Sequence, residues 1–172
     1  MRTLYLLRHA KSSWADPTVA DHERRLSPRG RRDAKLIADH IGRLGSAPSL
    51  VLCSTSRRTR ETLERVRAAL DTAAVSLEPE LYAASADTLL ERLHGVPDEI
   101  ASVMLIGHNP GLEDLALFVA SNGPELARLE AKFPTAALAT LTLLPTATWH
   151  RLSEADAVLA AYIVPKDLGL AR

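Results

Sequence analysis

The 172-residue sequence has little cysteine and few aromatic residues. Its one cysteine, Cys53, excludes an internal disulfide and any metal site built from several cysteines. Only seven residues, 4% of the chain, are Phe, Trp or Tyr, so the core must consist mainly of Leu, Val, Ile and Ala. A surface that stacks successive bases of a single-stranded nucleic acid is therefore not expected.

Long apolar runs are also lacking, since no segment reaches the ~18 residues of a membrane-spanning helix. The apolar N-terminal segment meets a charge at Arg8, too early for a signal peptide. We therefore expect a cytoplasmic protein with no membrane partner. The composition, 47% apolar and 24% charged, is that of a globular protein, and the length predicts one domain over residues 1–172.

The net charge is zero, but the charges are divided along the chain. Residues 1–70 contain 15 Lys and Arg against 7 Asp and Glu, a net of +8, and residues 71–172 carry a net of −8. A basic half is typical of a nucleic-acid-binding arm or of a pocket for an anionic substrate. It is also compatible with two oppositely charged faces that have no function. The charge distribution alone leaves these three interpretations open.

Continuous apolar segments alternate with segments of helical periodicity, a pattern that predicts an α/β fold. Ser27 and Pro28 form a helix-start signal, and apolar residues then recur on one face as far as Gly45. Further helices are expected over residues 59–70, 85–93 and 115–119. Strands are expected over residues 3–8, 49–53, 75–77, 103–106, 137–144 and 158–164.

Three of the predicted strands end in residues that carry chemistry, namely Arg8-His9, the run 54–58, and Gly107-His108-Asn109. Because ligands bind beyond the carboxyl ends of strands in open α/β sheets, two His and at least two Arg should converge there. A guanidinium matches the oxygens of a phosphoryl group, and an imidazole can attack phosphorus to form a phosphohistidine. The cluster therefore predicts phosphoryl transfer that needs no metal.

These motifs resemble the histidine phosphatase superfamily. The resemblance rests on Leu7-Arg8-His9, on Ser54 with Arg58 four residues later, and on Gly107-His108-Asn109. The short chain and the runs 8–11, 21–30 and 107–111 are most similar to its branch of SixA-type phosphohistidine phosphatases. The resemblance implies a three-layer α/β/α, phosphoglycerate mutase-like fold with a mixed, mainly parallel sheet. It implies neither a metal nor an organic cofactor.

Residue roles follow from the resemblance position by position. His9 would be the nucleophile that becomes phosphorylated, Arg8 and Arg58 would bind the phosphoryl oxygens, and His108 would donate a hydrogen bond to the same group. The usual general acid of the superfamily is a Glu near the third strand, where Glu80 is the nearest match but lacks the surrounding pattern. The run 11–15, Lys-Ser-Ser-Trp-Ala, lacks the Glu and Asn of the mutases, which argues against a mutase.

Several alternatives are open at this point. Cys53 with Arg downstream suggests a tyrosine-phosphatase loop, but position 59 is Thr where that loop needs Arg. Glu113 and Asp114 could ligate a metal, although acidic residues are also ordinary at a helix N-terminus. We expect a phosphatase acting through phospho-His9 on a phosphohistidine-bearing protein. The alternatives are a small-molecule phosphomonoesterase for sugar or nucleotide phosphates, and a non-enzymatic phosphate- or nucleic-acid-binding module, although clustered Arg argues against nucleic acid.

Overall fold

A computed structural model describes residues 1–169 of the chain. Its strands are β1 (Thr3–Arg8), β2 (Leu50–Ser54), β3 (Ala74–Glu78), β4 (Ser102–Gly107), β5 (Ala120–Asn122), β6 (Leu138–Leu143) and β7 (Ala157–Ile163). Its α-helices are α1 (Pro28–Gly42), α2 (Arg57–Val66), α3 (Ala86–His94), α4 (Gly111–Val119), α5 (Leu126–Ala131) and α6 (Pro165–Gly169). Short 3₁₀ helices are η1 (Asp21–Glu23), η2 (Arg67–Leu70) and η3 (Pro79–Leu81).

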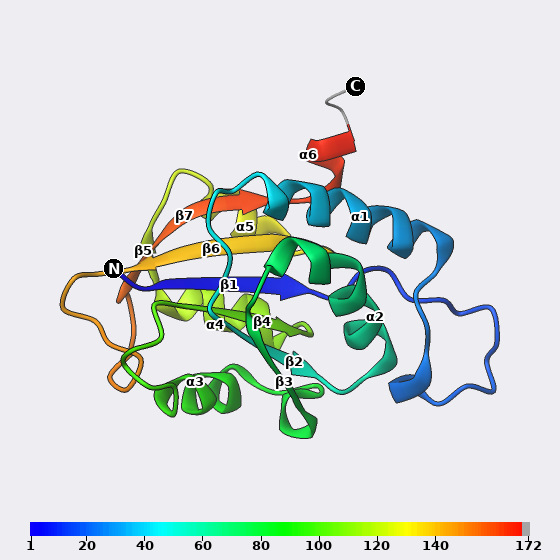
Figure 1. The fold of residues 1–172 in the computed structure, drawn as a ribbon, viewed down its shortest axis with the longest axis horizontal. Helices are drawn as coiled ribbons and strands as arrows, with labels where there is room; N and C mark the ends of the chain where they lie inside the picture. Colours follow the sequence, from blue (N-terminus) through cyan, green and yellow to red (C-terminus); the bar gives the residue numbers. More distant parts are fainter. Residues whose placement is uncertain (170–172) are drawn as a thin grey trace.

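The described strands form one seven-stranded sheet in the order β3-β2-β4-β1-β6-β7-β5, with helices on both faces (Figure 1). β6 runs antiparallel to both of its neighbours, β1 and β7. The other neighbouring pairs in this sheet are parallel. The predicted α/β/α fold with a mixed, mainly parallel sheet is therefore confirmed.

Side chains of the central strand β1 alternate between two apolar cores. Leu4 and Leu6 belong to the core that contains residues of α3, α4 and α5. Tyr5 and Leu7 belong to the core on the other face, formed with α1 and α2. Because both faces of the strand are buried, its sequence is a continuous apolar run instead of an alternating one.

The start of α1 is fastened to the segment that follows β1. The Ser27 hydroxyl accepts a hydrogen bond from the Gly30 amide at 3.0 Å, which confirms the predicted N-cap. The Ser27 amide donates to the Lys11 carbonyl at 2.9 Å. Gly30 packs so closely on that carbonyl that an added Cβ would lie 2.0 Å from its oxygen. The first turn of α1 thus holds the backbone just beyond His9.

The structure differs from the predicted elements mainly at short segments. The second predicted helix begins two residues earlier, at Arg57, with Ser56 as its N-cap, and its last four residues form η2. The elements β5, α5 and α6 were not predicted, because segments of three to six residues are too short to show a periodicity. Within residues 1–169, no helix is long and apolar enough to cross a membrane.

Replacing Gly30 by Ala is expected to destabilise the protein by about 2 kcal/mol, because the new methyl group meets a backbone oxygen that cannot move aside. The measurement is the free energy of unfolding in urea. Gly42→Ala in the same helix is the matched control, since its Cβ would find its nearest atom at 4.0 Å. That variant should be neutral or more stable by up to about 1 kcal/mol. Equal effects of the two substitutions would contradict the close packing.

Candidate functional site

The candidate site lies where β2, β4 and β1 end. These three strands are neighbours and parallel, so their carboxyl ends meet at one edge of the sheet. In Figure 1, β1 points toward the side of the molecule where the long blue connection to α1 lies. The ring centroids of His9 and His108 are 5.3 Å apart, and Arg58 Nη2 lies 3.4 Å from His108 Nδ1.

His9 is buried and held in one orientation. Its amide donates to the Gly107 carbonyl at 3.0 Å, and its own carbonyl accepts from the Ala136 amide at 3.0 Å. Its Nδ1 lies 2.7 Å from the Ala10 carbonyl oxygen, which can only accept, so Nδ1 carries the ring proton. Burial lowers the pKa of His9 to about 3. The ring is therefore neutral at pH 7, with the lone pair on Nε2.

Arg8 and Arg58 each have a buried Nε–H donor without a partner in the described chain. Arg8 Nη1 donates to the Phe133 carbonyl at 3.0 Å, and Arg58 donates through Nη1 and Nη2 to the Asp21 carbonyl and carboxylate, at 2.7 and 3.1 Å. The Nε atoms of both arginines are buried and have no hydrogen-bond partner within residues 1–169. A buried donor without a partner is costly, and an anion between the two guanidinium groups would satisfy both.

His108 is a buried, neutral imidazole with a partner on each side. Burial, with a further contribution from the charge of Arg58, lowers its pKa to about 4. Its Nε2 lies 2.8 Å from Ser54 Oγ, and its Nδ1 faces Arg58. Because a guanidinium can only donate, Nδ1 accepts in this arrangement and Nε2 holds the proton. Donation from Nδ1 to a phosphoryl oxygen therefore requires the proton to change nitrogen, with the Ser54 hydroxyl donating to Nε2.

Asp21 and Tyr82 are two residues of this site to which the sequence analysis assigned no role. The Asp21 carboxylate accepts hydrogen bonds from the Tyr82 hydroxyl, from Arg24 and from Arg58. The bond from Tyr82 and those from the two arginines hold the pKa of Asp21 well below its usual range. The Tyr82 ring packs edge-on against His108, with centroids 5.4 Å apart. Asp21 thus places a fixed negative charge beside Arg58.

Glu80, the predicted general acid, shares no hydrogen bond or ion pair with the described residues of this cluster. Its side chain is exposed on η3, and within residues 1–169 we find no hydrogen bond or ion pair that involves it. Tyr82, two residues further on, reaches the cluster instead. His22 is at the rim, where its Nε2 lies 3.0 Å from Thr55 Oγ1 and its ring packs on Tyr82. The only sequence signal for Tyr82 was its place just beyond the third strand.

The structure also bears on the two alternative site chemistries. Cys53 is buried, and burial raises its pKa to about 12, so it is a thiol and not a nucleophilic thiolate. Glu113 and Asp114 lie in the first turn of α4. Among the residues that the structure describes, no group of three or more His, Cys, Asp or Glu side chains is arranged to hold a metal ion.

Comparison with known proteins agrees with this geometry. The model of the histidine phosphatase superfamily (branch 1) matches residues 4–100. An uncharacterised protein of Mycobacterium leprae is 34% identical over 166 residues, which are 93% of this chain and 100% of the relative. A solved structure from Nakamurella multipartitia, assigned as the phosphohistidine phosphatase SixA, has a TM-score of 0.81 and 30% identity, covering 95% of this chain and 96% of the other.

A second structure with the same assignment, from Agrobacterium tumefaciens, has a TM-score of 0.79 and 32% identity, with coverage of 95% of this chain and 98% of the other. The family match spans more than half of the chain and includes Arg8, His9 and Arg58. The predicted resemblance is therefore confirmed. The chain belongs to the histidine phosphatase superfamily, in its SixA-like branch, and is a phosphatase.

Proposed function

We propose that this phosphatase removes phosphate from phosphohistidine in a partner protein, through a phospho-His9 intermediate and without a metal ion. One observation carries the proposal. A buried, neutral imidazole with its Nε2 lone pair available lies beside two guanidinium groups whose buried Nε–H donors have no partner in the described chain. The two SixA-like structures that resemble this chain are assigned as phosphohistidine phosphatases, which supports the same substrate class.

The first step is capture of the phosphoryl group. Arg8 and Arg58 offer charged donors that are already largely desolvated, so hydrogen bonds to a phosphoryl oxygen would be strong. His108 adds a third donor once its proton is on Nδ1, with the Ser54 hydroxyl donating to Nε2. These groups neutralise the oxygens that do not react, which is the main task in phosphoryl transfer.

The second step is transfer to His9. Its Nε2 lone pair forms a bond to phosphorus while the bond between phosphorus and the substrate's imidazole nitrogen breaks. The proton on Nδ1 stays hydrogen-bonded to the Ala10 carbonyl, so phosphorylation leaves the ring orientation unchanged. Water then attacks phosphorus, the bond to Nε2 breaks and returns its electron pair to His9, and inorganic phosphate leaves as H2PO4− with both protons of the attacking water.

The lack of a protonated carboxyl group within the described cluster favours phosphohistidine over ordinary phosphate esters. Asp21 stays ionised, and Glu80 forms no hydrogen bond or ion pair with the cluster, so we assign the acid role to neither. A phosphohistidine that carries a proton on its second ring nitrogen leaves as neutral imidazole and needs no such acid. A sugar phosphate would have to expel a basic alkoxide.

His9→Asn is expected to lower turnover of phosphohistidine and of an aryl phosphate by roughly 1,000-fold or more, because the variant has no nucleophile. The measurement is kcat/KM, together with trapping of the labelled phosphoenzyme in acid-free conditions. The exposed His150→Asn is the matched control and should keep wild-type activity. Label on another residue, or full activity of His9→Asn, would contradict the intermediate, and loss of wild-type activity in a chelator would contradict the metal-free reaction.

A substrate panel tests the leaving-group argument. We expect kcat/KM for phosphohistidine to exceed that for a sugar phosphate by roughly 100-fold or more, the usual contribution of a general acid that this site does not supply. An aryl phosphate, with its weakly basic leaving group, should fall between the two. Equal or higher kcat/KM for the sugar phosphate would favour the small-molecule phosphomonoesterase.

The free energy of unfolding should fall as the pH falls from about 6.5 toward 4. The pKa of His9 is about 3 in the folded protein and near 6.5 in the unfolded chain, so the unfolded state binds more protons in this range. His9→Asn removes this contribution and should show a smaller fall between pH 7 and pH 4.5 in urea titrations. His150→Asn should keep the wild-type slope, and identical slopes in all three proteins would show that His9 is not buried in its neutral form.

A further inference from the structure

The connection between β1 and α1 carries an exposed tryptophan. Trp14 is 69% exposed and Val19, on the same connection, is 37% exposed, whereas the other tryptophan, Trp149, is fully buried. In a chain with only two tryptophans, a solvent-exposed indole side chain is unusual. Large exposed aromatic side chains are typical of contact surfaces, where they supply most of the binding energy.

Trp14 is not a loose side chain. The Arg24 guanidinium lies 3.6 Å from the centre of its ring. Arg24 is itself buried and is fixed by hydrogen bonds to Asp21 Oδ1 at 2.9 Å and to Ser12 Oγ at 2.5 Å. The indole therefore sits on a rigid support, so little conformational entropy would be lost when a ligand packs on it.

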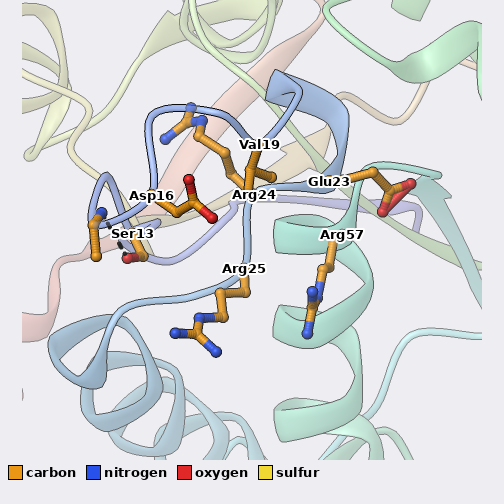
Figure 2. Close-up of a pocket in the computed structure, with 8 residues that line it drawn as sticks. Ser13, Asp16, Val19, Glu23, Arg24, Arg25 and Arg57 are labelled. Atoms are coloured by element: carbon orange, nitrogen blue, oxygen red, sulfur yellow. Dashed lines mark hydrogen bonds between the residues drawn. The ribbon is translucent and has the colours of Figure 1, made fainter.

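A pocket of about 210 Å³ is lined by Ser13 and Ala15, the chain neighbours of Trp14, and by Val19, Arg24, Arg25 and Arg57, among others (Figure 2). Figure 2 shows Arg25 from the loop and Arg57 from α2 extending to the same side. Arg57 pairs with Glu61 at 3.6 Å, but we find no ion pair for Arg25 among the described residues. Arg25 thus offers a guanidinium group that no direct ion pair among these residues occupies. Asp16 is the carboxylate whose pKa the hydrogen bonds from Thr18 and then the charge of Arg25 help to lower.

The two acidic residues of the pocket are already engaged. Asp16 accepts hydrogen bonds from the amide and hydroxyl of Thr18, at 2.9 and 2.6 Å. Glu23 lies 3.5 Å from Arg60 and 3.3 Å from His22. These hydrogen bonds fix the two carboxylates without cancelling their charge, but the pocket lining has three arginines, Arg24, Arg25 and Arg57, against these two acids, so its net charge is positive and complements an acidic ligand.

One carboxylate, that of Asp21, connects a residue that lines the pocket to the catalytic site. Asp21 accepts from Arg24, which supports Trp14, and from Arg58, which would bind the phosphoryl group. We infer that Trp14, Val19 and Arg25 form a docking surface for the phosphohistidine-bearing protein, which contacts it with an apolar side chain flanked by carboxylates. The inference rests on the proposed function and adds to it a preference for the sequence around the phosphohistidine.

Two synthetic peptides of equal length test the docking surface, each with one chemically phosphorylated histidine. One has Leu, Asp and Glu beside the histidine, and the other has Lys in place of the acids. We expect the wild-type protein to prefer the acidic peptide by tenfold or more in kcat/KM at low salt, through KM. Trp14→Ala and Arg25→Gln should each lose at least fivefold of this preference while kcat/KM on free phosphohistidine stays within twofold.

Phe118→Ala on α4, which removes another exposed aromatic side chain, is the matched control and should behave as wild type. Anisotropy titration with the labelled, unphosphorylated acidic peptide measures docking without turnover, and Trp14→Ala should weaken that binding as well. This arm separates the two proposals: peptide binding without hydrolysis of any phosphohistidine would overturn the proposed function and keep the docking surface.

Other outcomes would overturn the docking surface. Equal loss on the peptides and on free phosphohistidine would mean that Trp14 acts only through Arg24 on the catalytic site. Binding of a short single-stranded oligonucleotide as tight as that of the acidic peptide would mean that the stacked ring and free charge select nucleic acid. Urea unfolding of each variant identifies losses caused by unfolding, and Trp14→Phe, which keeps a ring over Arg24, should retain at least half of the peptide preference.

Discussion

The packing of two guanidinium groups against two buried imidazoles is the constraint around which this site is arranged. Arg8 and Arg58 repel each other, and protonation of either histidine would add a third positive charge to a buried region. The protein meets this constraint by keeping His9 and His108 neutral and by placing the carboxylate of Asp21 against Arg58. Under the proposed function a phosphoryl group supplies the remaining negative charge, so the site is electrostatically complementary to its ligand.

The fold supports that arrangement through backbone contacts more than through side chains. The His9 amide and carbonyl are tied to β4 and to the segment before β6, and the Ala10 amide donates to Thr62 Oγ1 on α2 at 3.0 Å. Two glycines permit close approaches nearby. Gly30 lets α1 reach the Lys11 carbonyl, and Gly111 at the start of α4 lies where a Cβ would be 2.0 Å from the Ala84 carbonyl oxygen. Helices on both faces of the sheet thereby pack closely against the segments around Lys11 and Ala84, which lie next to residues of the site.

The parts of the site that could be predicted from the sequence are those attached to regular structure. Arg8, His9 and His108 directly follow apolar strands, and Arg58 lies in the first turn of a helix, so the geometry of parallel strands brings them to one edge. Their convergence could be predicted from the order of strands and helices alone, without any information on side-chain contacts.

Asp21 and Tyr82 could not be found in this way. Asp21 lies in a polar connection without periodicity, and its position depends on tertiary contacts with Arg24, Arg58 and Tyr82. Glu80 lies in η3 and Tyr82 directly follows it. The path of the chain after β3 brings the Tyr82 ring against His108. The elements β5 and α5 escaped prediction for a related reason, since they are defined by their neighbours and not by a pattern of their own.

The carboxylate of Asp21 has one more consequence, which is thermodynamic. It accepts hydrogen bonds both from Arg24, which supports Trp14, and from Arg58, so under the proposed function and docking surface the occupancy of the two places would be linked. Linkage is reciprocal: if phosphate on Arg58 changes the affinity of the loop for a ligand by some factor, that ligand changes the affinity for phosphate by the same factor. Under these proposals, release of inorganic phosphate and release of the dephosphorylated protein would depend on the same coupling free energy.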